Sequence, residues 1–250
     1  MRDRLNYEVI GSETLPTVVL LHGMLSSNRQ WAPNIDALSA RFRLVPVELW
    51  GHGESPTPDD PDAFAIDGLI EALDEVRRET GSQTWSVIGY SYGGALALQY
   101  ALRRPEHTSA VVFTNSRAAM ATTTPDECEQ NATGFMSAAS VRELPFHPIH
   151  AGRLPAEIRD ELVDAADGTS AEAVGRLMRT SWQLSIRSRL AELTVPVTLV
   201  NGRHERAFQP DAEAIRRLAP QIDVFDVDAG HAVNMQAAEA FNEIAVRALL

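Results

Sequence analysis

Ser91 lies in the run Gly-Tyr-Ser-Tyr-Gly-Gly (89–94), which directly follows an apolar stretch at 85–88. A serine flanked by glycines at this spacing favours a sharp turn between a strand and a helix, because glycine permits the close backbone approach that such a turn requires. The turn would present the Ser91 hydroxyl to a ligand, and the N–H of Tyr92 would lie where an oxyanion develops. The pattern therefore predicts a nucleophile for acyl chemistry, although Gly-x-Ser-x-Gly alone also arises by chance.

Two other parts of the chain supply groups that fit this chemistry. A His-Gly-Met run at 22–24 ends an apolar segment, so the N–H of Met24 can point at the same oxyanion. His231 follows a β-rich run near the C-terminus and is the predicted base for Ser91. Serine first and histidine last is the chain order of one triad architecture.

A triad also needs an acid that orients the imidazole. The run Asn-Gly-Arg-His-Glu-Arg (201–206) follows a predicted strand, and Glu205 is the predicted acid for His231. In the alternative interpretation, Glu205 is a surface residue that pairs with a neighbouring arginine, and another residue supplies the acid. Asn115 ends the preceding core strand, at another place where an acid can stand, but its amide carries no charge.

Four blocks of the sequence together resemble the α/β-hydrolase superfamily, and the resemblance covers nearly the whole chain. The blocks are His-Gly-Met (22–24), Gly-His-Gly-Glu-Ser (51–55), the serine run (89–94) and Gly-His (230–231). The resemblance implies that the 51–55 block has a mainly structural role, so we assign no chemistry to His52 or Ser55. The family typically has an aspartate at the position of Glu205, with glutamate as a known variant.

Within the superfamily, the chain looks most like two groups that act on small molecules. One group is the carboxylic-ester hydrolases, and the other is the cofactor-free lyase that makes a cyclohexadiene carboxylate in menaquinone synthesis. Those lyases usually carry an arginine directly after the second glycine, where this chain has Ala95. Carbon–carbon bond hydrolases also resemble the chain, whereas haloalkane dehalogenases and epoxide hydrolases need an aspartate in place of Ser91. A ligand receptor built on the same fold is a further alternative.

The order of the predicted elements indicates an α/β fold: an α/β-hydrolase core with a mostly parallel central sheet and helices on both faces. Strands are expected at 5–10, 17–21, 43–47, 85–88, 110–114, 197–200 and 223–227, and core helices at 28–40, 64–80 and 94–102. The strand–helix alternation stops between the strands expected at 110–114 and 197–200. We therefore expect a core of residues 1–115 and 194–250 and an inserted helical cap at 116–193, with helices at 156–166 and 171–184.

The substrate pocket is expected beneath this cap, at the carboxyl ends of the strands. Tyr90 flanks the nucleophile, and Met178 and Trp182 lie in the cap, so these side chains predict an apolar pocket with aromatic surface. For the cap residues, ordinary helix packing is an equally good interpretation. Arg117 follows a strand end and could bind an anionic substrate, or it could simply be solvated.

Composition excludes several other classes of protein. The chain has 250 residues, enough for one large domain, and its formal net charge of −12 argues against nucleic-acid and anionic-membrane partners. No apolar stretch approaches the roughly 20 residues that a membrane-spanning helix needs. All 22 basic side chains are arginines, so chemistry that depends on an active-site lysine is excluded.

No cofactor and no metal are expected. His147 and His150 have no acidic or cysteine partner at convincing spacing for a metal site. The single cysteine, Cys128, cannot form an intrachain disulfide, and its polar neighbourhood makes it a poor nucleophile. The N-terminus shows no signal-peptide pattern, so a cytoplasmic protein is expected. The sequence leaves the oligomeric state undecided, and a homo-oligomer remains open.

Taken together, these residues predict a serine hydrolase that cleaves a small carboxylic ester or a related acyl compound through an acyl-enzyme. Ser91, His231 and Glu205 form the expected triad, and the N–H groups of Met24 and Tyr92 form the expected oxyanion hole.

Overall fold

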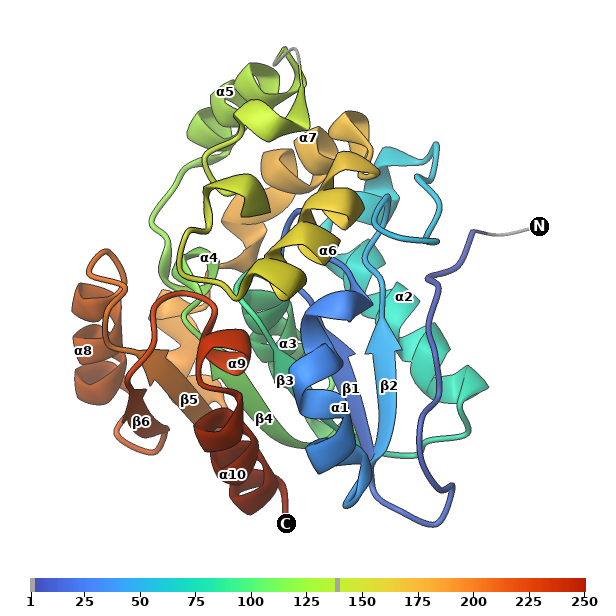
Figure 1. The fold of residues 1–250 in the computed structure, drawn as a ribbon, viewed down its shortest axis with the longest axis vertical. Coiled ribbons are helices and arrows are strands. Elements are labelled where there is room, and N and C mark those ends of the chain that lie inside the picture. The colour runs from blue at the N-terminus through green and yellow to red at the C-terminus, as the bar shows by residue number, and fades with distance from the viewer. Residues whose placement is uncertain (1–2, 138–139) are drawn as a thin grey trace.

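Six short, apolar segments form the central sheet of the computed structural model, which describes residues 3–137 and 140–250. They lie in the order β2-β1-β3-β4-β5-β6, and each neighbouring pair is parallel (Figure 1). The strands are β1 (Thr17–Leu21), β2 (Arg43–Val47), β3 (Trp85–Gly89), β4 (Thr108–Thr114), β5 (Val197–Gly202) and β6 (Asp223–Val227). The predicted α/β fold with a mostly parallel sheet is confirmed.

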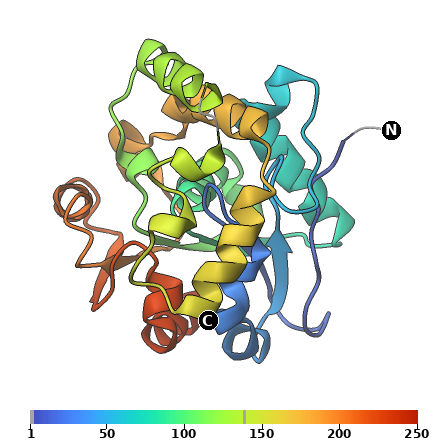
Figure 2. The same cartoon turned by 45° about the horizontal axis from the view of Figure 1, so that its top comes forward.

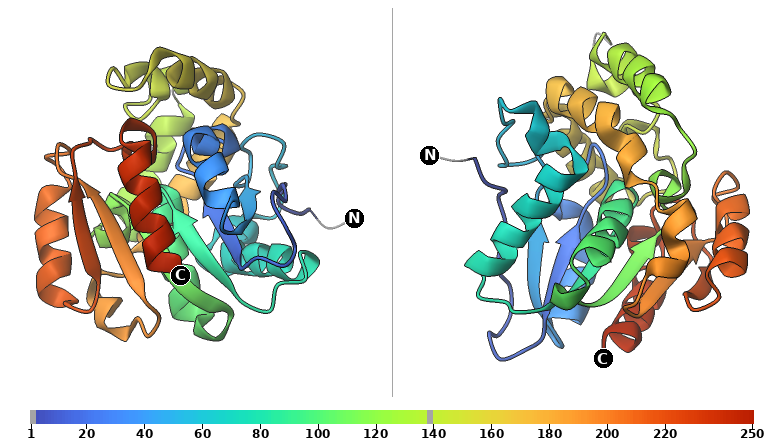
Figure 3. Two further views of the ribbon diagram at one scale, coloured as in Figure 1. Left: turned by 60° about the horizontal axis from the view of Figure 1, so that its bottom comes forward. Right: turned by 180° about the vertical axis from the view of Figure 1, so that it is seen from behind.

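Alternate residues of each strand enter two separate cores, because successive side chains of a strand point to opposite faces. In β1, Val19 and Leu21 pack in the core beneath α2, α3 and α8, whereas Val18 and Leu20 pack in the core beneath α1 and α10. Figure 3 shows the two helical layers from opposite sides. These helices are α1 (Ala32–Ser39), α2 (Ile66–Glu79), α3 (Tyr92–Arg103), α8 (Gln209–Leu218) and α10 (Ala238–Leu249).

Two predicted helices begin differently from the expectation. The helix predicted at 28–40 is a 3₁₀ turn, Asn28–Trp31, followed by α1, and Pro33 stands in the first turn of α1. The helix predicted at 64–80 begins as α2 at Ile66, after a separate 3₁₀ turn at Pro61–Phe64. Proline suits the first turn of a helix, because the N–H that it lacks would have no partner there.

The strand predicted at 5–10 is wrong. This segment runs antiparallel to β2 but forms only two isolated bridges, from Tyr7 to Val47 and from Ile10 to Leu44. Glu8 donates its N–H to the carbonyl of Pro46, and Pro46 has no N–H to return the bond. The ladder is therefore interrupted at its centre, although the alternation of side chains resembles that of a strand.

A long inserted segment (115–196) joins β4 to β5, and the predicted cap falls within it. Its helices lie beyond the carboxyl ends of the strands, and α5 packs against α7 (Figures 1 and 2). The short helix α9 (Val233–Gln236) lies in the loop after β6. The helices of the inserted segment are α4 (Arg117–Met120), α5 (Pro125–Met136), α6 (Ala156–Asp167) and α7 (Ala171–Thr180), and a 3₁₀ turn follows α7 at Ser181–Leu184.

Helix α5 was not expected from the sequence, and it contains Cys128. Thr124 caps the helix reciprocally with Glu127. Only Cys128 and Ala132 of this helix are buried, so its apolar periodicity is too weak to reveal it. Cys128 therefore lies in a helix, although its neighbours in the sequence are polar. Its thiol is buried and lies 3.4 Å from the Ser181 hydroxyl.

Candidate active site

Ser91 connects β3 to α3 in a strained backbone conformation, with φ 53° and ψ −112°. Such a conformation costs a residue with a Cβ of the order of 1–3 kcal/mol, and it persists only where the surroundings impose it. Gly93 lets the turn pack directly on β1, because a Cβ on Gly93 would overlap the carbonyl oxygens of Leu21 and His22. The strand–turn–helix arrangement expected around Ser91 is therefore present.

A second serine supports this turn from β4. Ser116 is fully buried and donates its hydroxyl proton to the carbonyl oxygen of Ser91, over 2.6 Å. This bond joins the segment after β4 to the backbone of Ser91 and not to its side chain. The sequence analysis missed Ser116, and its position directly after a predicted strand end was the available signal.

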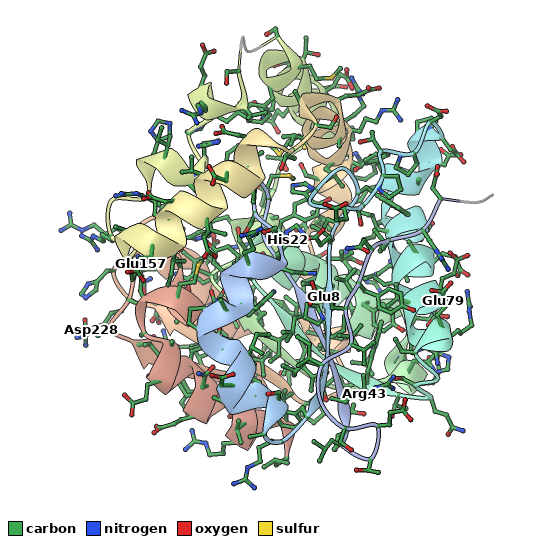
Figure 4. The ribbon with its side chains drawn as sticks, turned by 45° about the vertical axis from the view of Figure 1, so that its right-hand side comes forward. Glu8, His22, Arg43, Glu79, Glu157 and Asp228 are labelled. Carbon is green, nitrogen blue, oxygen red and sulfur yellow. The ribbon has the colours of Figure 1, made fainter. Side chains whose placement is uncertain are left out.

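Two buried histidines hold the loop that follows β1. Nε2 of His22 accepts the N–H of Leu49, and Nε2 of His52 accepts the N–H of Leu25. Burial lowers the pKa of His22 to about 4 and the pKa of His52 to about 3, so both rings are neutral acceptors at neutral pH. The label in Figure 4 places His22 inside the molecule. The structural role that the sequence predicted for His52 agrees with these contacts.

This loop carries Met24, one of the two predicted oxyanion donors. Among the described residues, no hydrogen bond uses the Met24 N–H, and the next residue, Leu25, has a positive φ of 51°. Tyr92 is the first residue of α3, where backbone N–H groups have no partner within the helix. Met24 and Tyr92 line the same cavity as Ser91. Two amide donors are thus available near the hydroxyl.

Glu205 and His231 meet through a side-chain hydrogen bond. Nδ1 of His231 donates to Oε2 of Glu205 over 2.8 Å, and the carboxylate is largely buried. The two residues lie in the loops after β5 and β6, which are neighbours in the sheet. Gly202 lets these loops approach, because a Cβ there would overlap the carbonyl oxygen of Gly230.

The alternative pairing of Glu205 with a neighbouring arginine is not what the structure shows. Arg203 forms an ion pair with Asp228 instead, over 2.9 Å. Asp228 lies at the surface of the molecule (Figure 4). Although burial by itself would raise the pKa of the Glu205 carboxyl, the hydrogen bonds from His231 and Asn115 and the charge of Arg117 hold it below its usual value. Glu205 is therefore a carboxylate at neutral pH.

Asn115 anchors this carboxylate from the end of β4. Its Nδ2 donates to Oε2 of Glu205 over 2.7 Å, the same oxygen that accepts from His231. Asn115 also accepts the N–H of Gly202 and donates to its carbonyl. The sequence analysis considered Asn115 only as a replaced acid. The structure shows it as a residue that positions the Glu205 carboxylate.

The Tyr90 ring packs against the imidazole of His231. The two ring centroids lie 5.1 Å apart in an edge-to-face arrangement, at 61°. Burial and the nearby Glu205 charge raise the pKa of the Tyr90 hydroxyl, so the ring stays neutral. Tyr90 therefore restricts the orientation of the imidazole without adding charge.

A cavity of about 760 Å³ brings most of the predicted residues together. The loop 145–154 of the inserted segment covers it from above, and the strand ends form its floor. The predicted site residues that line it are Met24, Tyr90, Ser91, Tyr92, Arg117, Met178, Glu205 and His231. Ser91 and His231 both line this cavity, and no hydrogen bond among the described residues joins their side chains.

Trp182 does not line this cavity. It lies in the 3₁₀ turn after α7, with 39% of its surface exposed, so the structure does not bring it to the other site residues. The sequence pattern could not distinguish an inward from an outward aromatic residue there, because the segment changes from α-helix to 3₁₀ turn at Ser181.

His147 and His150 line the cavity, but each is engaged in a backbone contact. Nδ1 of His147 accepts the N–H of Ile149, and Nε2 of His150 donates to the carbonyl of Arg142. Among the described residues, no group of three or more histidine, cysteine, aspartate or glutamate side chains is arranged to hold a metal ion. The two histidines shape the loop above the cavity.

The family model described as the alpha/beta hydrolase fold matches residues 16–167. The chain belongs to this family. The matched region of this alpha/beta hydrolase includes β1 to β4, the Ser91 turn and the first part of the inserted segment. It ends before β5, so Glu205 and His231 lie outside the match.

Relatives of this alpha/beta hydrolase carry different activities in their names. A Bacillus subtilis (strain 168) protein, provisionally named as a 2-succinyl-6-hydroxy-2,4-cyclohexadiene-1-carboxylate synthase, is 26% identical over 94% of this chain and 90% of its own length. Carboxylesterase YbfK of the same organism is 26% identical over 93% of this chain and 80% of its own length. The crystal structure of a hydrolase from Pseudomonas aeruginosa PA01 has the same fold, with a TM-score of 0.86 at 19% identity, and the match covers 98% of this chain and 94% of that one.

None of the helices in the described part of the alpha/beta hydrolase combines the length and the apolar character that crossing a membrane requires.

Proposed function

We propose that this alpha/beta hydrolase is a serine hydrolase that cleaves a small carboxylic ester or a related acyl compound. Ser91 attacks the carbonyl carbon while His231 takes its proton, and Glu205 stabilises the imidazolium that forms. The N–H groups of Met24 and Tyr92 bind the oxyanion. His231 then returns the proton to the leaving alcohol and activates a water molecule that releases the acyl group.

The contact between Glu205 and His231 carries this proposal. A carboxylate that accepts from Nδ1 holds the imidazole in the tautomer whose Nε2 can accept a proton. Both residues line the cavity that contains Ser91. An imidazole oriented in this way, in one cavity with a strained serine turn, supports acyl transfer better than ligand binding alone.

The choice of an ester as substrate is supported by three further observations. The cavity has apolar walls, including Met24 and Met178, and its volume of about 760 Å³ is in the range of small-molecule sites. The chain is similar to carboxylesterase YbfK over most of both lengths. No lysine is present to form a Schiff base with a carbonyl substrate.

Fluorophosphonate labelling tests this function directly. We expect one equivalent of label on the peptide that contains Ser91, identified by mass spectrometry, and turnover of 4-nitrophenyl esters that is lost in Ser91→Ala. Label on another residue, or full ester turnover in Ser91→Ala, would exclude the proposed mechanism. Ligand binding by the wild-type protein without turnover of any acyl compound would instead favour the receptor interpretation.

A cofactor-free lyase is the second candidate, because the similarity to the Bacillus subtilis synthase extends over 90% of that protein. The position after the second glycine holds Ala95, which is fully buried in the core and contributes no charge to the cavity. Release of pyruvate from the synthase precursor, followed with a coupled lactate dehydrogenase assay, distinguishes this lyase from an ester hydrolase.

A further inference from the structure

The net charge of the side chains that line the cavity is positive, whereas the net charge of the whole chain is negative. The protein has 34 acidic and 22 basic side chains, yet Glu205 is the one carboxylate among the described residues that line the cavity. Its charge is already engaged by His231 and Asn115. Two arginines, Arg117 and Arg153, also line the cavity. These three side chains give the wall two positive charges against one negative charge.

Arg117 stands at the inner side of this wall. It is the first residue of α4 and follows Asn115 and Ser116, the two buried residues after β4, and its side chain is exposed. Burial alone would raise the pKa of Glu205, and the Arg117 charge is among the influences that lower it. Arg117 is thus close to the acid of the proposed triad, although no ion pair or hydrogen bond among the described residues occupies its guanidinium.

Arg153 lines the same cavity from the inserted segment. The next residue, Leu154, packs in a small apolar cluster with Ala232 and Met235, and Ala232 directly follows His231. This packing fixes the loop that carries Arg153 beside the loop that carries the proposed base. Among the described residues, the exposed guanidinium of Arg153 also has no acidic partner.

Among the described residues of the inserted segment, Arg117 and Arg153 are the arginines that have no acidic partner. Elsewhere in the segment, arginines on the outer surface form ion pairs with acidic neighbours. Arg142 pairs with Asp167, Arg176 with Glu172, and Arg179 with Glu129. Within the inserted segment, the two arginines without an acidic partner are thus the two that line the cavity, and a free guanidinium is suited to binding an anion.

We propose that Arg117 and Arg153 bind a carboxylate group of the substrate, so that the preferred substrate is an ester that also carries a carboxylate. The inference rests on the serine-hydrolase function proposed above and narrows its substrate class. Arginine suits this task because its planar guanidinium binds a carboxylate through two parallel hydrogen bonds. The net charge of −12 does not oppose binding at this range, since salt screens charges beyond about 8 Å at physiological ionic strength.

The test compares pairs of esters that differ in one charge. For a charge on the alcohol side, the pair is 3-acetoxybenzoate and 3-acetoxybenzamide. For a charge on the acyl side, it is 4-nitrophenyl hydrogen adipate and 4-nitrophenyl methyl adipate. We expect kcat/KM of the wild-type protein to be about 10-fold or more higher for the anionic member of at least one pair, as one charge-assisted contact would produce.

Variants of the two arginines assign this preference to the subsite. Arg117→Gln and Arg153→Gln should each lower the ratio of anionic to neutral kcat/KM, and the double variant should bring it close to 1. Arg206→Gln is the matched control, because Arg206 is exposed, adjoins Glu205 in the sequence and does not line the cavity. The control should keep the wild-type ratio.

The outcomes separate this subsite from the proposed function. Ser91-dependent hydrolysis with no anionic preference in either pair, or a preference that both arginine variants retain, would overturn the subsite and leave the serine hydrolase intact. No turnover of any ester would reject the hydrolase. Calorimetry with benzene-1,3-dicarboxylate and its diamide then decides the subsite: selective binding of the dicarboxylate that Arg117→Gln abolishes supports it, and equal or absent binding refutes it.

Discussion

Oε2 of Glu205 lies 2.8 Å from Nδ1 of His231, and this one contact joins the loops that follow the last two strands of the sheet. The same oxygen accepts from Asn115 at the end of β4. Three neighbouring strand ends therefore determine the position of one carboxylate. Because both hydrogen bonds favour the ionised carboxyl, the acid keeps its charge where burial alone would favour the neutral form.

Replacing this carboxylate with an amide should impair catalysis more than stability. In Glu205→Gln, we expect kcat for 4-nitrophenyl acetate to fall by about 10²- to 10⁴-fold, because the imidazolium loses its counter-charge and the tautomer is no longer fixed. Glu205→Asp keeps the charge and should lose much less. Equal kcat in wild type and Glu205→Gln would show that another residue is the acid.

A carboxylate at position 115 can replace the negative charge that Glu205→Gln removes. Asn115→Asp alone should lower activity at neutral pH, since two carboxylates would share one hydrogen-bonding position and one would take up a proton. Combined with Glu205→Gln, the same substitution returns a negative charge beside His231 and should recover about 10-fold of the lost kcat. Glu205→Gln with Asn115→Leu is the control, and recovery there would disprove the electrostatic explanation.

The strained backbone of Ser91 predicts that replacing this residue with glycine increases stability. Ser91→Gly removes the Cβ that disfavours φ 53° and should raise the free energy of unfolding by about 1 kcal/mol, the relief of strain less the greater entropy of unfolded glycine. Ser91→Ala retains a Cβ and should be close to wild type. Urea unfolding of the three proteins measures the difference. A Ser91→Gly protein less stable than Ser91→Ala would mean that the turn is not strained.

The neutral state of His52 predicts a dependence of stability on pH. Burial lowers its pKa from 6.5 to about 3, so the unfolded chain binds more protons than the folded chain between these values. The contribution is complete above pH 6.5 and is lost as the pH falls toward about 3. His52→Gln keeps an acceptor for the Leu25 N–H but does not titrate.

The slope of unfolding free energy against pH measures this effect. Between pH 4 and pH 6, the slope in His52→Gln should be smaller than in wild type by as much as about 1.4 kcal/mol per pH unit, the value for one proton. Identical slopes in the two proteins would show that His52 takes up its proton equally in the folded and the unfolded chain, so that burial does not lower its pKa.

Much of the fold was predictable because its causes are local. The strands beginning at Thr17 and Trp85 are apolar runs of strand length, and the Ser91 turn follows from glycines whose missing side chains permit close packing. The strand expected at 5–10 fails for a reason outside that segment, because Pro46 of β2 cannot donate the bond that would complete the ladder.

The sequence by itself determined the order of the elements, the serine turn and the types of residue available for chemistry, since these depend on neighbours within a few positions. Only the tertiary structure decided that Asn115 holds Glu205 against His231, that Arg117 and Arg153 face one cavity, and that Trp182 does not. Those relationships join residues far apart in the chain. They arise where parallel strands end side by side, and no local periodicity records which distant side chains meet there.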